Sequence, residues 1–127
     1  MPTDAVEFLG VRFDRLTMEE TLARLAEVSA DTPYGFVVTP NVDHVVRLDA
    51  LGADSPIVRG YAGADLSLCD SRIVQRLGGL HGIDLPLVPG SDLTVRLLNE
   101  VVRAGDRIAV VGGSADLLGD LRKRFPK

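Results

Sequence analysis

The order of strand-type and helix-type segments after residue 34 is the feature that most restricts how this chain can fold. Three short apolar runs, Gly35–Thr39, Asp65–Cys69 and Arg107–Val111, each precede a segment with helical periodicity. Buried apolar strands that alternate with helices are typical of a parallel sheet with helices packed on its faces. We therefore expect an α/β fold in which the three strands run parallel and the crossovers are right-handed.

The N-terminal segment predicts a small β-hairpin followed by a helix. Val6–Leu9 and Val11–Phe13 are short β-type runs on either side of a glycine. Thr17 and Glu20 have the spacing of a capping box, in which each side chain binds the other residue's backbone amide. The helix that begins there is expected to end near Asp31–Pro33.

The remaining helices are expected in the segments between and after the strands. They span about Val42 to Leu51, Ile57 to Ala62, Ile73 to Leu77, a helix capped by Ser91 or Asp92 that runs to about Arg103, and Ala115 to Arg124. The segment Gly78–Pro89 is rich in Gly and Pro and predicts a loop. We expect one domain over residues 1–127. Because a final helix that ends in Phe-Pro usually leads into another strand, this domain is expected to be truncated or completed by a partner chain.

Composition and charge exclude several classes of protein. Hydrophobic residues make up 46% of the chain and charged residues 25%, as in folded globular domains. The net charge of −4 argues against a nucleic-acid-binding protein. The single cysteine cannot form an intramolecular disulfide, which fits a cytoplasmic location. The sequence has no signal peptide and no apolar run of about 18 residues, so membrane contact would be peripheral. Self-association could cover exposed sheet edges, so a homo-oligomer is one alternative.

Polar or glycine-rich turns follow all three predicted strands. These turns are Thr39–Asn41, Asp70–Ser71 and Gly112–Ser114. The carboxyl ends of parallel strands share one edge of a sheet, and ligands bind in the crevice beyond it. The turn with Gly112 and Gly113 resembles a phosphate-binding turn, although a tight strand-to-helix connection explains it equally well. The sequence therefore predicts a ligand site at this edge.

Asp70 is the leading candidate for a reactive group. A carboxylate at the rim of a parallel sheet could act as a base, bind a ribose hydroxyl or hold a metal, but Asp70 could equally cap a helix that starts at Ser71. Thr39 and Asn41 offer a hydroxyl and an amide, which suit a sugar or a nucleobase. Asn41 could instead, or in addition, cap the next helix, and capping is also the alternative for Asp92.

Other reactive side chains favour structural roles. Cys69 ends an apolar strand with no histidine placed near it by the sequence, so a buried inert thiol is favoured over a nucleophile. His44 could titrate near neutrality, but a lone histidine in a helix is more often structural. No Asp-x-Asp pair is present, so we expect no metal site. The charge of a diphosphate would then be met by arginines, amides or helix ends.

Five sequence blocks stand in a distinctive order and spacing. They are Thr39–His44 (TPNVDH), Tyr61–Leu66 (YAGADL), Asp70, Gly90–Asp92 (GSD) and Val110–Gly113 (VVGG). Together they resemble the N-terminal half of the WecG/TagA/CpsF family of bacterial glycosyltransferases, and the resemblance extends over nearly the whole chain. It implies a Rossmann-like α/β domain.

The resemblance also implies a reaction and a set of site residues. Members of the family transfer N-acetylmannosamine or a related sugar from a UDP-sugar to a polyprenyl-diphosphate-linked acceptor, with inversion and without a metal cofactor. Their products enter teichoic acid and other cell-surface polysaccharides. By resemblance Asp70 is the catalytic base, and the residues that bind substrate are Thr39, Asn41, Asp92, Gly112 and Gly113.

Two departures from the family pattern affect this expectation. Ser71 follows Asp70 where the family has glycine, and Leu87–Pro89 stands where the family has an arginine, a loss that Arg72 could offset. These departures keep open a truncated, non-catalytic nucleotide-binding or assembly module. A dinucleotide-dependent oxidoreductase is disfavoured, because no Gly-x-Gly-x-x-Gly follows any predicted strand.

Overall fold

The fold begins with the predicted β-hairpin. The structure is a computed structural model that describes residues 4–125. Strand β1 (Ala5–Phe8) pairs antiparallel with β2 (Val11–Asp14). Leu9 and Gly10 join them, both with left-handed backbone (φ 54° and 77°). This conformation at both turn residues matches the twist of paired strands and makes a tight two-residue connection.

Helix α1 (Met18–Ala26) begins with the predicted capping box. The Thr17 hydroxyl accepts the Glu20 amide at 3.2 Å, and the Glu20 carboxylate accepts the Thr17 amide at 3.2 Å. The predicted end of this helix near Asp31–Pro33 is wrong, because the helix stops several residues earlier. A hydroxyl in that segment, that of Thr32, accepts a backbone amide at 2.9 Å and closes a turn instead.

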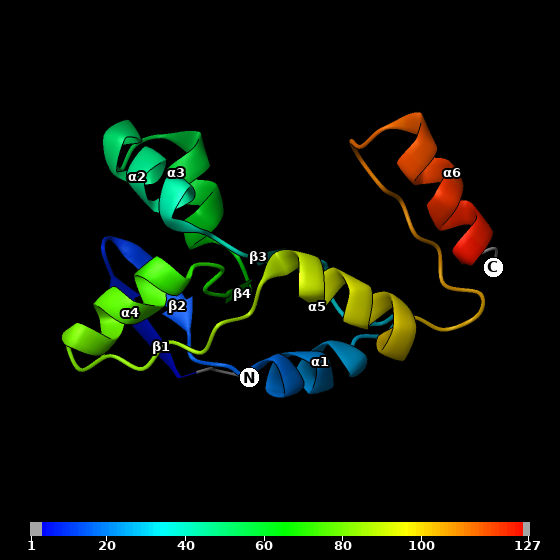
Figure 1. The fold of residues 1–127 in the computed structure, drawn as a ribbon, viewed down its shortest axis with the longest axis horizontal. Helices are drawn as coiled ribbons and strands as arrows, with labels where there is room; N and C mark the ends of the chain where they lie inside the picture. Colours follow the sequence, from blue (N-terminus) through cyan, green and yellow to red (C-terminus); the bar gives the residue numbers. More distant parts are fainter. Residues whose placement is uncertain (1–3, 126–127) are drawn as a thin grey trace.

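A small parallel sheet lies at the centre of the molecule (Figure 1). It consists of β3 (Val37–Val38) and β4 (Leu66–Ser67). Two residues after β4, Cys69 forms a parallel bridge with Leu87, and the Val88 amide donates to the Cys69 carbonyl at 2.8 Å. The hairpin, the parallel sheet and the surrounding helices confirm the predicted α/β class, in a form consistent with a Rossmann-like fold.

An extra residue in β4 connects the sheet to the hairpin. The amides of Asp65 and Leu68, on either side of β4, donate to the Phe36 and Val38 carbonyls at 2.9 Å. The chain therefore advances three residues along β4 and only two along β3. The surplus amide, that of Ser67, donates to Asp14 Oδ2 at 2.8 Å. Asp14 lies at the end of β2 and is 3% exposed, and an Arg12 nitrogen lies 3.5 Å from the same oxygen. A buried carboxylate thus takes the place of a neighbouring strand.

Three helices follow the strands close to their predicted positions. They are α2 (Val42–Leu51), α3 (Pro56–Ala62) and α4 (Arg72–Leu80). The predicted loop from Gly78 is wrong in its first residues, because α4 continues through both glycines. Gly78 is buried, and a Cβ on it would lie 3.2 Å from the Ile83 carbonyl oxygen. The glycine therefore permits close packing within the helix instead of ending it.

Helix α5 (Gly90–Arg96) continues directly into a π-helical turn, Leu97–Val101. The predicted cap at Ser91 or Asp92 is wrong, because the helix begins one residue earlier. Its N-cap position is Pro89, which has no capping side chain. The helical segment ends at Val101, close to the predicted end near Arg103, although its last turn is π-helical.

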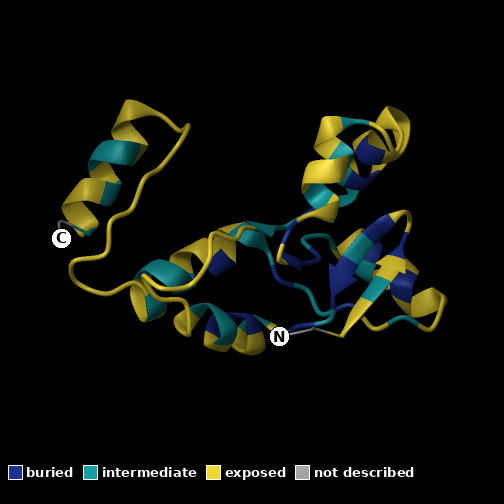
Figure 2. Ribbon diagram, turned by 180° about the vertical axis from the view of Figure 1, so that it is seen from behind, coloured by how far each residue is buried: buried dark blue, intermediate teal, exposed yellow. Residues whose placement is uncertain are grey.

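The third predicted strand, Arg107–Val111, is not formed in the structure. The segment has no strand or bridge, and Ile108, Val110 and Val111 are 51%, 53% and 98% exposed. It leads to α6 (Ala115–Arg124), and both lie away from the hairpin and the parallel sheet (Figures 1 and 2). An apolar run supplies strand propensity, but a strand forms only where another strand satisfies its backbone groups.

Two clusters of buried side chains hold the sheet in place. One joins the hairpin, α2 and α4, and consists of Phe8, Val11, Phe13, Val45, Leu48, Cys69, Val74 and Leu85. The other joins α1, β4 and α5, and consists of Leu16, Leu22, Leu66, Leu68, Val88 and Leu93. Both clusters draw on residues 66–69, so burial from two sides positions the chain immediately before Asp70. Figure 2 shows the buried residues gathered around the hairpin and β4.

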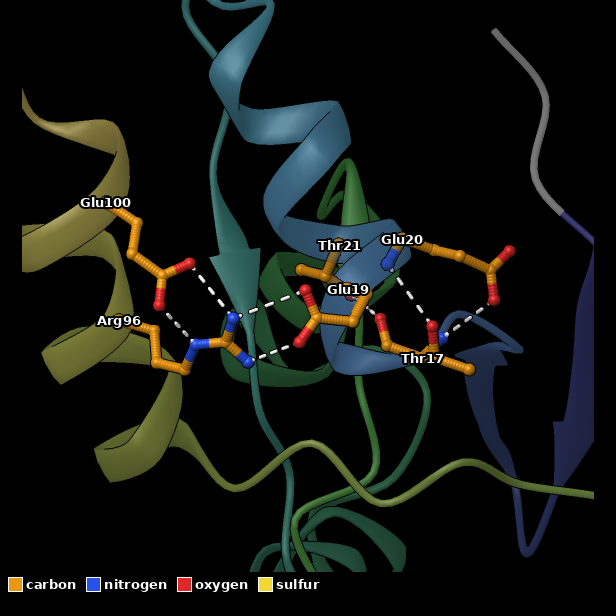
Figure 3. A network of polar contacts seen from close by, with 6 residues as sticks. All are labelled: Thr17, Glu19, Glu20, Thr21, Arg96 and Glu100. Carbon is orange, nitrogen blue, oxygen red and sulfur yellow. Dashed lines mark hydrogen bonds and ion pairs between the residues drawn. The ribbon is translucent and has the colours of Figure 1, made fainter.

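A surface network of charges links α1 to α5 (Figure 3). The Arg96 guanidinium donates to both carboxylate oxygens of Glu19 and to both of Glu100, with Nε 2.6 Å from Glu100. These bonds raise the pKa of Arg96 and lower that of Glu100. The carboxylates are largely exposed, so water and salt weaken the network, which orients the helices more than it stabilises the fold.

The lowered pKa of Glu100 predicts a dependence of stability on pH. A carboxyl group whose pKa is lower in the folded state stabilises the fold above its unfolded-state pKa, about 4.3, and loses that effect as pH falls through the folded value. We expect Glu100→Gln to lower the melting temperature slightly at pH 7 and by less at pH 3. Melting curves by circular dichroism check this, with Glu27→Gln at the C-cap of α1 as the control. Equal losses at both pH values would contradict it.

Candidate functional site

Thr39 and Asp70 meet at the carboxyl ends of β3 and β4, as their positions after the strands predict. The Asp70 amide donates to the Pro40 carbonyl at 3.1 Å, which continues the pairing of the two strands. Asp70 Oδ2 accepts the Gly90 amide at 3.1 Å. A Cβ placed on Gly90 would lie 2.6 Å from Thr39 Oγ1 and 3.6 Å from Asp70 Oδ2. Hydroxyl, carboxylate and amide therefore form one compact group.

The surroundings of Asp70 distinguish a role in the site from a role as a helix cap. Ser71, and not Asp70, caps α4, because the Ser71 hydroxyl accepts the Val74 amide at 3.1 Å. The interpretation of Asp70 as the cap of that helix is wrong. Cys69 before it is buried, and burial raises the pKa of its thiol, which fits the inert role expected for it. Asp70 itself is only half-buried, so a ligand can reach its carboxylate.

Asn41 caps α2, as one of the two interpretations of this residue predicted. Its Oδ1 accepts the His44 amide at 3.0 Å, and His44 Nδ1 accepts the Asn41 amide at 3.1 Å. Because Nδ1 accepts, the proton of the neutral ring is on Nε2. The His44 ring lies 6.3 Å from the Tyr61 ring, and both line a cavity of about 430 Å³ with Arg47 and apolar residues of α2 and α3. Asn41 and His44 thus connect this cavity to the Thr39 turn.

Loss of the Asn41 cap is expected to destabilise the protein measurably. Asn41→Ala leaves the His44 amide without its acceptor and costs about 1 kcal/mol of unfolding free energy. Asn41→Asp keeps an acceptor oxygen at the N-terminus of α2 and is expected to be near wild type. Urea denaturation of both variants measures the difference. A stable Asn41→Ala variant would show that the cap contributes little.

The other predicted site residues do not join this group. Asp92 is exposed in the first turn of α5. Gly112 and Gly113 form an exposed turn with left-handed backbone (φ 92° and 80°), and Ser114 caps α6 after it. This turn lies away from β3 and β4 in both views (Figures 1 and 2). The roles of these residues in substrate binding stay predictions. Of the three turns expected to converge, only the Thr39 and Asp70 turns lie together.

Two residues to which the sequence analysis gave no role shape the site. Gly90 supplies the amide that binds Asp70, and Asp14 holds the Ser67 amide a few residues before Asp70. Gly90 stands at the end of a Gly- and Pro-rich loop, so its type alone gave no signal of a role. In the structure its backbone is not left-handed, and a glycine in that conformation indicates that another group approaches closely. Asp14 carries no local signal, because its partner lies 53 residues away.

Within the described residues, no cluster of three or more His, Cys, Asp or Glu side chains could hold a metal ion. No helix between residues 4 and 125 is both long and apolar enough to cross a lipid bilayer. The Asp70 group offers one accessible carboxylate beside a hydroxyl and a helix amide.

Comparison with known proteins agrees with the sequence blocks. No curated protein and no solved structure matches the chain. The model of the glycosyl transferase WecG/TagA/CpsF family matches residues 6–127, a range that contains both core clusters and the Thr39–Asp70 group. The chain therefore belongs to the WecG/TagA/CpsF family of glycosyltransferases.

Proposed function

We propose that this protein transfers N-acetylmannosamine or a related sugar from a UDP-sugar to a polyprenyl-diphosphate-linked acceptor, with inversion at the anomeric carbon. The observation that carries the proposal is the accessible Asp70 carboxylate, held through one oxygen by Gly90 and flanked by Thr39. Asp70 Oδ1 has no hydrogen-bond partner within residues 4–125, so it is free to accept a proton. The lipid acceptor would bring the protein to the cytoplasmic face of the membrane as a peripheral partner.

The proposed chemistry is a single displacement assisted by a general base. Asp70 Oδ1 takes the proton of the acceptor hydroxyl as its oxygen forms a bond to the anomeric carbon. The bond between that carbon and the diphosphate oxygen breaks, and UDP leaves with the electron pair. Attack opposite the leaving group inverts the configuration. Arg72, exposed at the start of α4 one residue beyond Ser71, is the nearest arginine in sequence that could offset the diphosphate charge.

A transfer assay tests the proposal directly. The chain is incubated with UDP-N-acetylmannosamine and a polyprenyl-diphosphate-linked sugar, and UDP release and the lipid product are measured. A control without acceptor separates transfer from hydrolysis of the donor. Product of inverted configuration is expected, at a rate that a metal chelator leaves unchanged. If neither UDP nor product appears with this donor or other UDP-sugars, the proposal is wrong.

One observation favours a second candidate, a non-catalytic module that binds a nucleotide or takes part in assembly. The Gly112–Gly113 turn, expected to face the nucleotide, lies away from β3 and β4 (Figures 1 and 2). Titration calorimetry with UDP distinguishes the two candidates, because binding without any turnover supports the second. Light scattering in the same buffer shows whether the chain forms a homo-oligomer.

A further inference from the structure

We propose that Gly90 is a positioning residue for sugar transfer: its amide orients the Asp70 carboxylate, and its missing side chain keeps the Thr39 hydroxyl beside that carboxylate. The inference rests on the proposed function, in which Asp70 is the base. Gly90 does not itself touch the reacting atoms. Its contribution is to direct Asp70 Oδ2 towards α5, so that Oδ1 is the oxygen left for the substrate.

The first support is the distance between Gly90 and its two neighbours. Its amide nitrogen is 3.1 Å from Asp70 Oδ2, and a Cβ would meet Thr39 Oγ1 at 2.6 Å. Real Cβ atoms essentially never approach another heavy atom that closely. With any side chain at this position, either the Thr39 hydroxyl or the start of α5 would have to move.

The second support is that glycine has no local advantage at this position. Gly90 is the first residue of α5, where alanine is the better helix former. Its backbone is not in the left-handed region that favours glycine. Gly79, inside α4, provides the contrast, because a Cβ on it would meet nothing within 4 Å. Space between Thr39 and Asp70 is therefore the physical reason for a glycine at residue 90.

A double-mutant cycle tests this role. Gly90→Ala is expected to lower kcat by about 10- to 100-fold with little change in KM for the UDP-sugar, because a displaced base slows the chemical step more than binding. In a Thr39→Ala background the 2.6 Å contact is gone and the nearest remaining contact is 3.4 Å or longer. There Gly90→Ala should change kcat by about twofold or less. Gly79→Ala is the matched control and should leave kcat unchanged. Equal losses in both backgrounds would overturn the inference.

A second measurement does not depend on activity. The first four amides of a helix have no partner within it, so slow hydrogen exchange of the Gly90 amide reports its bond to Asp70. We expect exchange measured by NMR to be about 10-fold faster in Asp70→Ala and near wild type in Asp70→Asn. If Asp70→Ala leaves exchange unchanged, the contact does not exist and the inference is wrong, whatever the transfer assay shows. If exchange responds but the wild-type chain transfers no sugar, the proposed function fails and the positioning role fails with it.

Discussion

Asp70→Asn is expected to lower kcat for sugar transfer by about 10²- to 10⁴-fold while the fold stays intact. An amide cannot take the acceptor proton, and general-base assistance contributes a factor of this size. The Asn side chain still offers an oxygen to the Gly90 amide, so the contact that holds the start of α5 can persist. Steady-state rates of UDP release and a melting curve of the same sample measure the two effects.

Comparison variants separate the roles of the Asp70 carboxylate. Asp70→Ala removes both the base and the acceptor for Gly90, so it is expected to lose activity and also about 1 kcal/mol of stability. Asp54→Asn changes an exposed carboxylate in the turn before α3 and should affect neither quantity. Turnover by Asp70→Asn within about tenfold of wild type would remove Asp70 as the base, since that loss is below the range expected for base catalysis.

Phe13→Ala is expected to cost about 3–5 kcal/mol of unfolding free energy, the largest effect of any single substitution considered for this chain. Phe13 is 0% exposed and belongs to the cluster that joins the hairpin to α2, α4 and Cys69. Its removal leaves a cavity that the surrounding elements can fill only in part. Since domains are stable by only about 5–15 kcal/mol, much of the folded population would be lost. Denaturant unfolding followed by circular dichroism measures the change.

The Phe13→Ala substitution should also disturb the site around Asp70. The same cluster contains Cys69, so loosening it frees the residue that precedes Asp70. We expect Phe13→Ala to lose transfer activity at temperatures where Val46→Ala, which truncates a side chain 63% exposed on α2, keeps it. A Phe13→Ala protein as stable as wild type would show that the hairpin does not depend on this cluster.

The elements that the sequence predicted well are those whose signals are local. The Leu9–Gly10 turn sets the hairpin, the Thr17 and Glu20 pair sets the start of α1, and the Asn41 cap sets the start of α2. In each case the groups that make the bonds lie within a few residues of one another. Family membership was predictable for a similar reason, because it rests on short blocks whose order can be read directly.

The errors occurred where the outcome depends on distant groups. The run Arg107–Val111 has strand propensity but no neighbouring strand, so it stays exposed. Gly78 is a residue type that often ends helices, yet it packs against Leu85 and lies within α4. Asp92 resembles a helix cap, yet α5 starts earlier, at Gly90, whose amide bonds to Asp70 from 20 residues away.

The sequence by itself determined the α/β class, the family and the candidate base, because periodicity, caps and motif blocks are properties of neighbouring residues. Only the tertiary structure decided what Asp70 binds, which of the predicted turns reach it, and why residue 90 is a glycine. Those outcomes depend on contacts between segments far apart in the chain, namely the Thr39 turn, the end of β4 and the start of α5. Such contacts form only when the two buried clusters bring these segments together.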